Sequence, residues 1–175
     1  MDIKNLLKEY EEIKEDDYII KMTDKKLSSL ICNLCEFWLN TENHIASSKF
    51  SRNIWYSYEY KIWNLGENLR FLLKRRKDIQ KSESLQKTIN AIISNKKYGK
   101  GRESFALLPG EFKFSLSIDT LIKMLYDEDI QGHIIISLIK LKVKGLDKEI
   151  KLIAETKDGW ISKKAKKYLE LQITW

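Results

Sequence analysis

Glycine and proline are scarce in this sequence, which has seven glycines and one proline among its 175 residues. Together they make up under a twentieth of the chain, whereas average usage gives roughly an eighth. β-Sandwiches, barrels and propellers need turn residues every few positions, so this scarcity argues against them and favours helices. The length fits a single domain, because domains usually hold roughly 100–200 residues.

Cysteines and long apolar runs are also scarce. The two cysteines fit a reducing compartment, in which thiols stay free. The longest apolar run, residues 134–139, has six residues and includes a serine, while a membrane-spanning helix needs roughly 18 uncharged residues. The charged opening, residues 1–4, differs from the basic-then-apolar start of a secretory signal. We therefore expect a cytoplasmic protein that does not cross a membrane.

Positive charge is concentrated in two parts of the chain, which has a net charge of +7. Residues 74–102 carry ten Lys and Arg against two acids, and residues 140–175 carry ten against five. The residues between them, 103–139, carry two against six. Such basic blocks can attract a phosphate or an acidic protein surface, and they can equally be an ordinary solvated surface.

Apolar residues recur every three or four positions through most of the chain, which predicts amphipathic helices. In the first part of the chain the spacing predicts helices over residues 3–13, 27–38, 51–77 and 82–94. A basic, glycine-containing turn at residues 95–104 separates them from a short helix over 103–108, which we expect Pro109 to end. Four further helices follow between residues 118 and 169.

These last four predicted helices form two copies of one unit. A helix, an Asp-containing turn and a second helix occur twice, which is the arrangement of a helical-hairpin repeat. An offset of 31 residues superimposes the copies and pairs Leu121 with Leu152, Ile122 with Ile153, Asp127 with Asp158, Ile130 with Ile161, Ile134 with Ala165 and Leu138 with Leu169.

The repeated residues resemble the HEAT-like family, whose units place an Asp turn before a β-branched residue, a small or apolar residue four positions later and Leu four later again. The offset is shorter than the roughly 40 residues usual in that family, and Gln131 and Ser162 stand where it has Arg. The resemblance implies an all-α fold of stacked antiparallel helical hairpins, a right-handed α-α superhelix or α-solenoid. Within a single helical domain over residues 1–175, we expect an irregular N-terminal region over 1–100 and HEAT-like repeats over 117–172.

Aromatic residues are dense at the start of the long predicted helix. Residues 55–63 include five aromatics in nine positions, Trp55, Tyr56, Tyr58, Tyr60 and Trp63. Five aromatics at this spacing cannot all point into one core stripe. Either both faces of the helix are buried, or one face is a contact surface on which Tyr56, Tyr60 and Trp63 bind a partner.

The glycine-containing turn offers a second group of candidates. Backbone amides of a glycine turn before a helix can cradle an anion. Residues 99–104 lack the Walker spacing, however, and Ser104 replaces the third glycine of GxGxxG. The alternatives are an ordinary turn between helices, and a surface where Lys97, Tyr98, Lys100 and Arg102 contact an acidic partner or a phosphate.

The candidate metal and catalytic residues have simpler interpretations. Cys32 and Cys35 have the spacing of a zinc pair, with His44 nearby, but a fourth ligand is missing and Cys35 continues an apolar helix face. His133 follows the acidic residues 127–129, which suggests a base oriented by a carboxylate, but no nucleophile motif accompanies it. We therefore predict no catalytic residue, no metal and no cofactor.

These observations favour a non-catalytic protein-binding module, because stacked hairpins present a broad face to another macromolecule. By analogy with helical-repeat proteins, an immunity-type or adaptor protein with a cognate protein partner is the expected role. The alternative is a basic nucleic-acid binder that resembles the fold of the HEAT-like DNA glycosylases. A purely structural or oligomerising helical protein is a third possibility, and the sequence leaves the oligomeric state open.

Overall fold

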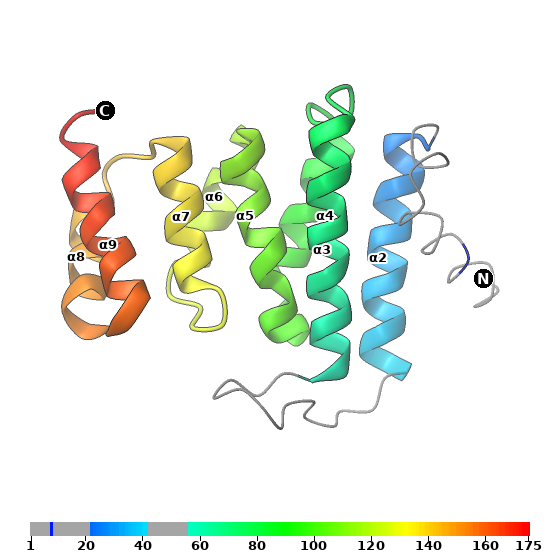
Figure 1. Ribbon diagram of the computed structural model, residues 1–175, viewed down its shortest axis with the longest axis horizontal. Coiled ribbons are helices and arrows are strands. Elements are labelled where there is room, and N and C mark those ends of the chain that lie inside the picture. The colour runs from blue at the N-terminus through cyan, green and yellow to red at the C-terminus, as the bar shows by residue number, and fades with distance from the viewer. Residues whose placement is uncertain (1–7, 9–21, 42–55) are drawn as a thin grey trace. The chain divides into compact units, whose positions relative to one another are not determined.

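The structure is a computed structural model, and it describes residue 8, residues 22–41 and residues 56–175. The described part of the chain is helical and contains no β-strand, which confirms the all-α prediction (Figure 1). The helix predicted over 3–13 lies outside the described residues, except for Lys8. The elements are α2 (Asp24–Thr41), α3 (Ser57–Arg75), α4 (Glu83–Ser94), the 3₁₀ segment η2 (Lys96–Arg102), α5 (Glu103–Phe112), the 3₁₀ turn η3 (Ser115–Ser117), α6 (Ile118–Lys123), α7 (Gln131–Leu141), α8 (Asp147–Thr156) and α9 (Gly159–Gln172).

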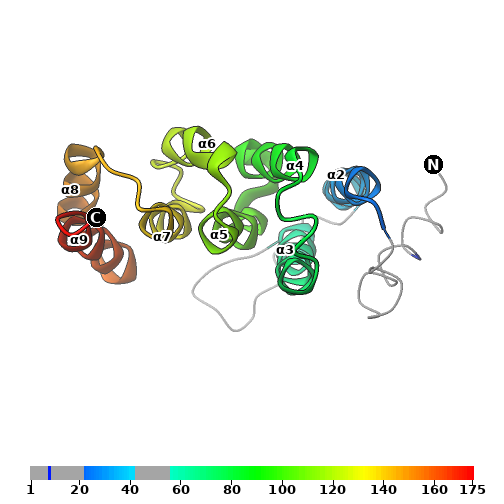
Figure 2. The same ribbon diagram turned by 90° about the horizontal axis from the view of Figure 1, so that it is seen from above.

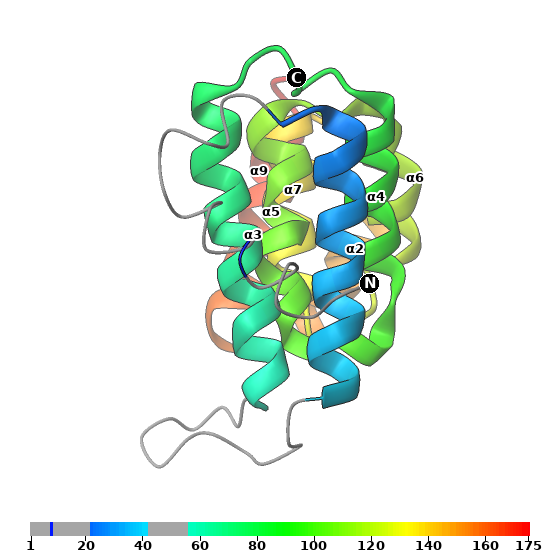
Figure 3. The same ribbon diagram turned by 90° about the vertical axis from the view of Figure 1, so that its right-hand side faces the viewer.

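The chain divides into two compact units, an N-terminal unit (Met1–Phe105) and a C-terminal unit (Ala106–Trp175). In the N-terminal unit α2 packs against both α3 and α4, and α3 packs against η2 (Figure 3). The apolar side chains that recur every three or four residues along these helices meet in the core, where Ile31, Ile62 and Ile89 have no exposed surface. Hydrophobic burial of these faces therefore holds the unit together.

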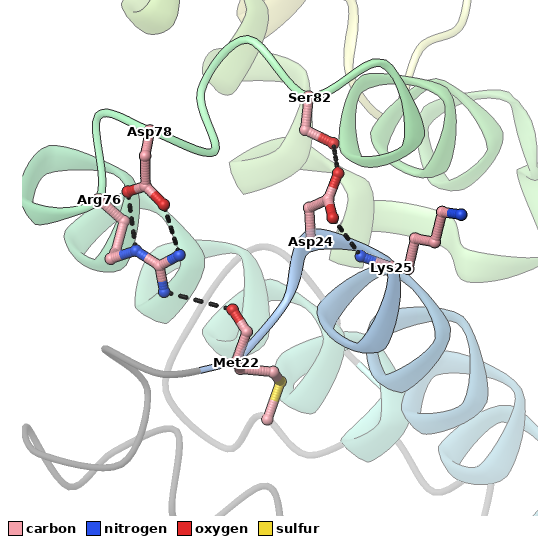
Figure 4. A network of polar contacts seen from close by, with 6 residues as sticks. All are labelled: Met22, Asp24, Lys25, Arg76, Asp78 and Ser82. Atoms are coloured by element: carbon pink, nitrogen blue, oxygen red, sulfur yellow. Dashed lines mark hydrogen bonds and ion pairs between the residues drawn. The ribbon is translucent and has the colours of Figure 1, made fainter.

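Polar contacts fix the start of α2 beside the connection between α3 and α4 (Figure 4). The Asp24 carboxylate accepts hydrogen bonds from the Ser82 hydroxyl at 2.5 Å and from the Lys25 amide at 2.9 Å. The Ser82 hydroxyl also caps α4, because its oxygen accepts from the Leu85 amide at 3.2 Å. Hydrogen bonding from Ser82 lowers the pKa of Asp24. The Asp24–Ser82 contact therefore joins the N-terminal ends of α2 and α4.

In the C-terminal unit α5 lies directly against α7 (Figure 2). A Cβ on Gly110 would lie 2.5 Å from the Cα of Ser137, so only glycine permits this approach. The Ser137 hydroxyl donates to the Ala106 carbonyl at 2.5 Å. This packing explains why the prediction that Pro109 ends its helix is wrong: α5 continues to Phe112, since tertiary contacts outweigh the local preference of proline.

The remaining helices of this unit form two hairpins, α6 with α7 and α8 with α9, and α7 also contacts α9. The 31-residue offset pairs residues of equal burial in the second helix of each hairpin, α7 and α9, where Ile134 and Ala165 are both fully buried. It fails for the first helices, because it pairs the buried Leu121 with Leu152, which is 50% exposed. The connections explain the difference, since seven residues join α6 to α7 and two join α8 to α9.

Candidate functional site

Helix α3 has one buried face and one exposed aromatic face. The buried face consists of Tyr58, Ile62, Leu65, Leu69 and Leu72. The opposite side carries Tyr56 (38% exposed), Tyr60 (58% exposed), the half-buried Trp63 and Phe71 (59% exposed). We call these four residues the aromatic face of α3.

Helical periodicity places the aromatic face on one side of α3. Within α3, Tyr60 and Trp63 are three residues apart, and two further steps of four reach Glu67 and Phe71, which is the spacing of a single helical stripe. Tyr56 stands just before the helix in an extended conformation, and its ring stacks on Tyr58 with centroids 5.8 Å apart. The Tyr60 and Trp63 rings stack with centroids 6.3 Å apart and an interplanar angle of 19°. Tyr56 and Tyr60 are exposed, so the two faces of this helix are not both buried.

Cationic side chains surround the C-terminal end of the aromatic face. The Arg70 guanidinium carbon lies 5.7 Å from the centre of the Phe71 ring, and the Lys74 ammonium lies 5.5 Å from it. Arg70 also pairs with Glu67 at 2.6 Å. Sequence reasoning missed Phe71, although continuing the three- and four-residue spacing beyond Trp63 would have found it.

The glycine-containing turn holds a carboxylate of its own chain. Glu59, only 5% exposed, accepts hydrogen bonds from the Tyr56 amide at 2.8 Å and from the Lys100 amide at 2.9 Å. The same side chain thereby caps α3 and fixes η2 on it. Gly99 lies in the left-handed region, with φ of 49°. The loop amide that would bind a phosphate is therefore occupied by Glu59.

Two of the predicted partner contacts in this turn are interior residues, which corrects the prediction for Tyr98 and Arg102. Arg102 has no exposed surface and donates to the Gly99 carbonyl at 2.8 Å and to the Ile93 carbonyl at 3.1 Å. Tyr98 is 3% exposed and its hydroxyl donates to the Glu36 carboxylate. Burial raises the pKa of Tyr98, and the hydrogen bond to Glu36 raises it further. Of the other two residues predicted here, Lys97 is exposed and Lys100 is half-buried.

The cysteine pair lies on α2, where Cys35 is fully buried and Cys32 is half-buried. Burial raises the pKa of both thiols, so both favour the neutral form that packs in a core. His44 lies outside the described residues. Over residues 22–41 and 56–175 no three His, Cys, Asp or Glu side chains come together as metal ligands.

His133 lies on α7 and packs against an aromatic side chain from α9. Its ring meets Trp160 edge-on, with centroids 5.2 Å apart and an interplanar angle of 64°. Trp160 also covers Gly132, where a Cβ would lie 2.0 Å from the indole ring. Burial lowers the pKa of His133 from 6.5 to about 4, so the imidazole is neutral at pH 7 and contributes to packing between α7 and α9.

The lowered pKa of His133 predicts a loss of stability in mild acid. The unfolded chain binds the proton near pH 6.5 and the folded chain only near pH 4, so stability falls as the pH decreases between these values. We expect His133 to account for about 2 kcal/mol of this loss, less than the full shift implies because the ring is half-buried and solvent screens its charge. Urea unfolding at several pH values should show a shallower loss for His133→Gln than for the wild type, and equal slopes would contradict the assignment.

Comparison with known proteins gives no match to a family model, a curated protein or a solved structure. In the described parts of the chain, no helix is both long and apolar enough to span a membrane. The aromatic face of α3 places two exposed aromatic side chains, Tyr60 and Phe71, on one side of one helix.

Proposed function

We propose that this protein is a non-catalytic protein-binding module and that the aromatic face of α3 contacts its partner. The observation that carries the proposal is the exposure of Tyr60 and Phe71, each more than half exposed on one side of one helix. Exposed apolar residues gathered on one face commonly mark an interaction site. Tyr and Trp are also enriched among the residues that contribute most to binding energy.

The arrangement of the C-terminal unit supports a helical-repeat architecture for this module. Its two hairpins and the contact between α7 and α9 are consistent with a short stack of antiparallel hairpins, similar to the HEAT-like family. Such stacks act as rigid scaffolds for recognition. An immunity-type or adaptor protein that binds a cognate protein is the role we propose.

Binding to nucleic acid is the second candidate, favoured by charge. Over residues 22–41 and 56–105 the N-terminal unit has fourteen Lys and Arg against seven Asp and Glu. Exposed aromatics can also stack on unpaired bases. We prefer a protein partner because the exposed side chains of the face, Tyr60 and Phe71, are of the kinds enriched at protein–protein interfaces.

Removing the exposed aromatics Tyr60 and Phe71 should weaken partner binding without unfolding the protein. We expect Tyr60→Ala/Phe71→Ala to bind its partner at least about tenfold more weakly than the wild type, while its stability changes by about 0.5 kcal/mol or less, as is usual for surface sites. Tyr126→Ala/Leu152→Ala is the matched control, since Tyr126 is 56% and Leu152 is 50% exposed in the other unit.

The measurement is quantitative affinity capture with the three proteins side by side, together with mobility shift of DNA and RNA across a salt series. Loss of the same captured protein from the Tyr60/Phe71 variant alone would support the proposal. Capture that is unchanged in this variant would contradict it. Nucleic-acid binding that falls steeply with salt and requires Tyr60 and Phe71 would replace it with the second candidate.

A further inference from the structure

We infer that the aromatic face of α3 takes an acidic amphipathic helix of a partner protein. This inference depends on the proposed function, because it names the partner that the same surface accepts. Two properties of the described residues support it: the linear arrangement of the aromatic side chains and the positive charge at one end of them.

The aromatic side chains of the face are spaced to match a second helix. Trp63 and Phe71 are eight residues apart on α3, which at 1.5 Å per residue separates them by about 12 Å. A second helix with apolar residues at i, i+3 or i+4, and i+7 presents anchors at a similar separation, about two turns, and can pack along α3. An extended peptide would have no unpaired strand edge to join, since the backbone of α3 is hydrogen-bonded within the helix.

Positive charge is concentrated at the C-terminal end of α3. Residues 70–77 contain five Lys and Arg and no Asp or Glu. Lys74 and Arg75 are exposed. Residues 67–78 carry five Lys and Arg against two acids, Glu67 and Asp78, so this end of α3 has a net positive charge. A partner that buries an apolar residue on Phe71 places its flanking residues close to Lys74. Acidic flanking residues would be attracted there and basic ones repelled.

The test uses the full-length chain and three fluorescent helical peptides that share one apolar pattern and differ only at the flanking positions. These positions are all Glu, all Gln or all Lys, and binding is followed by fluorescence anisotropy at about 50 mM and about 300 mM salt. We expect the Glu peptide to bind at least about fivefold more tightly than the Gln peptide at low salt. We expect the Lys peptide to bind most weakly, and the differences to shrink at high salt.

Charge reversal on the protein should reverse the preference between the peptides. Lys74→Glu/Arg75→Glu should weaken binding of the Glu peptide at least about fivefold and strengthen binding of the Lys peptide. Lys163→Glu/Lys167→Glu, which changes two exposed lysines on α9, is the matched control. It should change the binding of neither the Glu peptide nor the Lys peptide. Tyr60→Ala/Phe71→Ala should weaken the binding of all three peptides.

Three results would overturn the inference. Equal binding of the Glu and Gln peptides that still requires Tyr60 and Phe71 would overturn the acidic partner while the proposed function stands. A concentration-dependent dimer in sedimentation that Tyr60→Ala/Phe71→Ala abolishes would assign the face to a second copy of this chain. Binding of no peptide to the full chain would also overturn it.

Discussion

Replacing Arg102 with leucine is expected to lower the free energy of unfolding by about 3 kcal/mol. The Arg102 side chain has no exposed surface, and its guanidinium donates to the carbonyls of Gly99 and Ile93. Leucine would remove both donors and leave buried carbonyl oxygens without them. It would also fill less of the space between α4 and η2, so a packing defect adds to the lost hydrogen bonds.

Urea unfolding followed by circular dichroism measures this effect, with Lys97→Leu as the control in the same segment. Lys97 is exposed, so its replacement should change the free energy of unfolding by about 0.5 kcal/mol or less. If Arg102→Leu behaved like Lys97→Leu, Arg102 would have to be a surface residue, and its assignment to the interior would be wrong. Arg102→Lys should recover only part of the loss, because an ammonium cannot reproduce the planar arrangement of guanidinium donors.

Replacing Gly99 with alanine is expected to cost about 3 kcal/mol, for two reasons that add. The backbone of Gly99 has φ of 49° and ψ of −135°, a region that residues with a Cβ rarely adopt. A Cβ there would also lie 1.8 Å from Oε1 of Glu59, whose carboxylate is held by the Tyr56 and Lys100 amides. The side chain of Glu59 must therefore move and lose at least one of these hydrogen bonds.

Gly159→Ala separates the two contributions to this cost. Gly159 has φ of +64°, but no atom of a neighbouring element lies within 4 Å of the position that a Cβ would take. Its replacement should therefore cost only about 1 kcal/mol, the penalty of the left-handed backbone. Thermal or urea unfolding of both variants gives the difference. Equal losses would show that Glu59 does not crowd Gly99. They would contradict the assignment of Glu59 as the side chain that fixes η2 on α3.

The sequence predicts the two stripes of α3 correctly, but it cannot decide whether the second stripe is exposed. Periodicity places Tyr60 and Trp63 on one side of the helix and Ile62 on another. Exposure depends on whether another element packs there, and such an element can come from anywhere in the chain. The structure supplies this answer, and it extends the same stripe to Phe71.

Arg102 and Pro109 show a different limit of prediction from sequence. An arginine within a basic, glycine-containing turn resembles a surface residue, because Arg is seldom fully buried. Its acceptors, the carbonyls of Gly99 and Ile93, come within reach only once η2 has formed. Helix α5 continues through Pro109 to Phe112, and the adjacent Gly110 packs closely on Ser137. In both cases a tertiary contact outweighs a local preference.

Site-specific photocrosslinking tests the role of the aromatic face most directly. A photoreactive phenylalanine analogue is placed at Tyr60, at Phe71 or, as a control, at Tyr126, and the protein is irradiated in its native cells. We predict one covalent adduct with the same protein from positions 60 and 71 and none from position 126, with an acidic helical peptide at the crosslink. Adducts with nucleic acid, or equal adducts from all three positions, would contradict the assignment of α3 as the protein-binding surface.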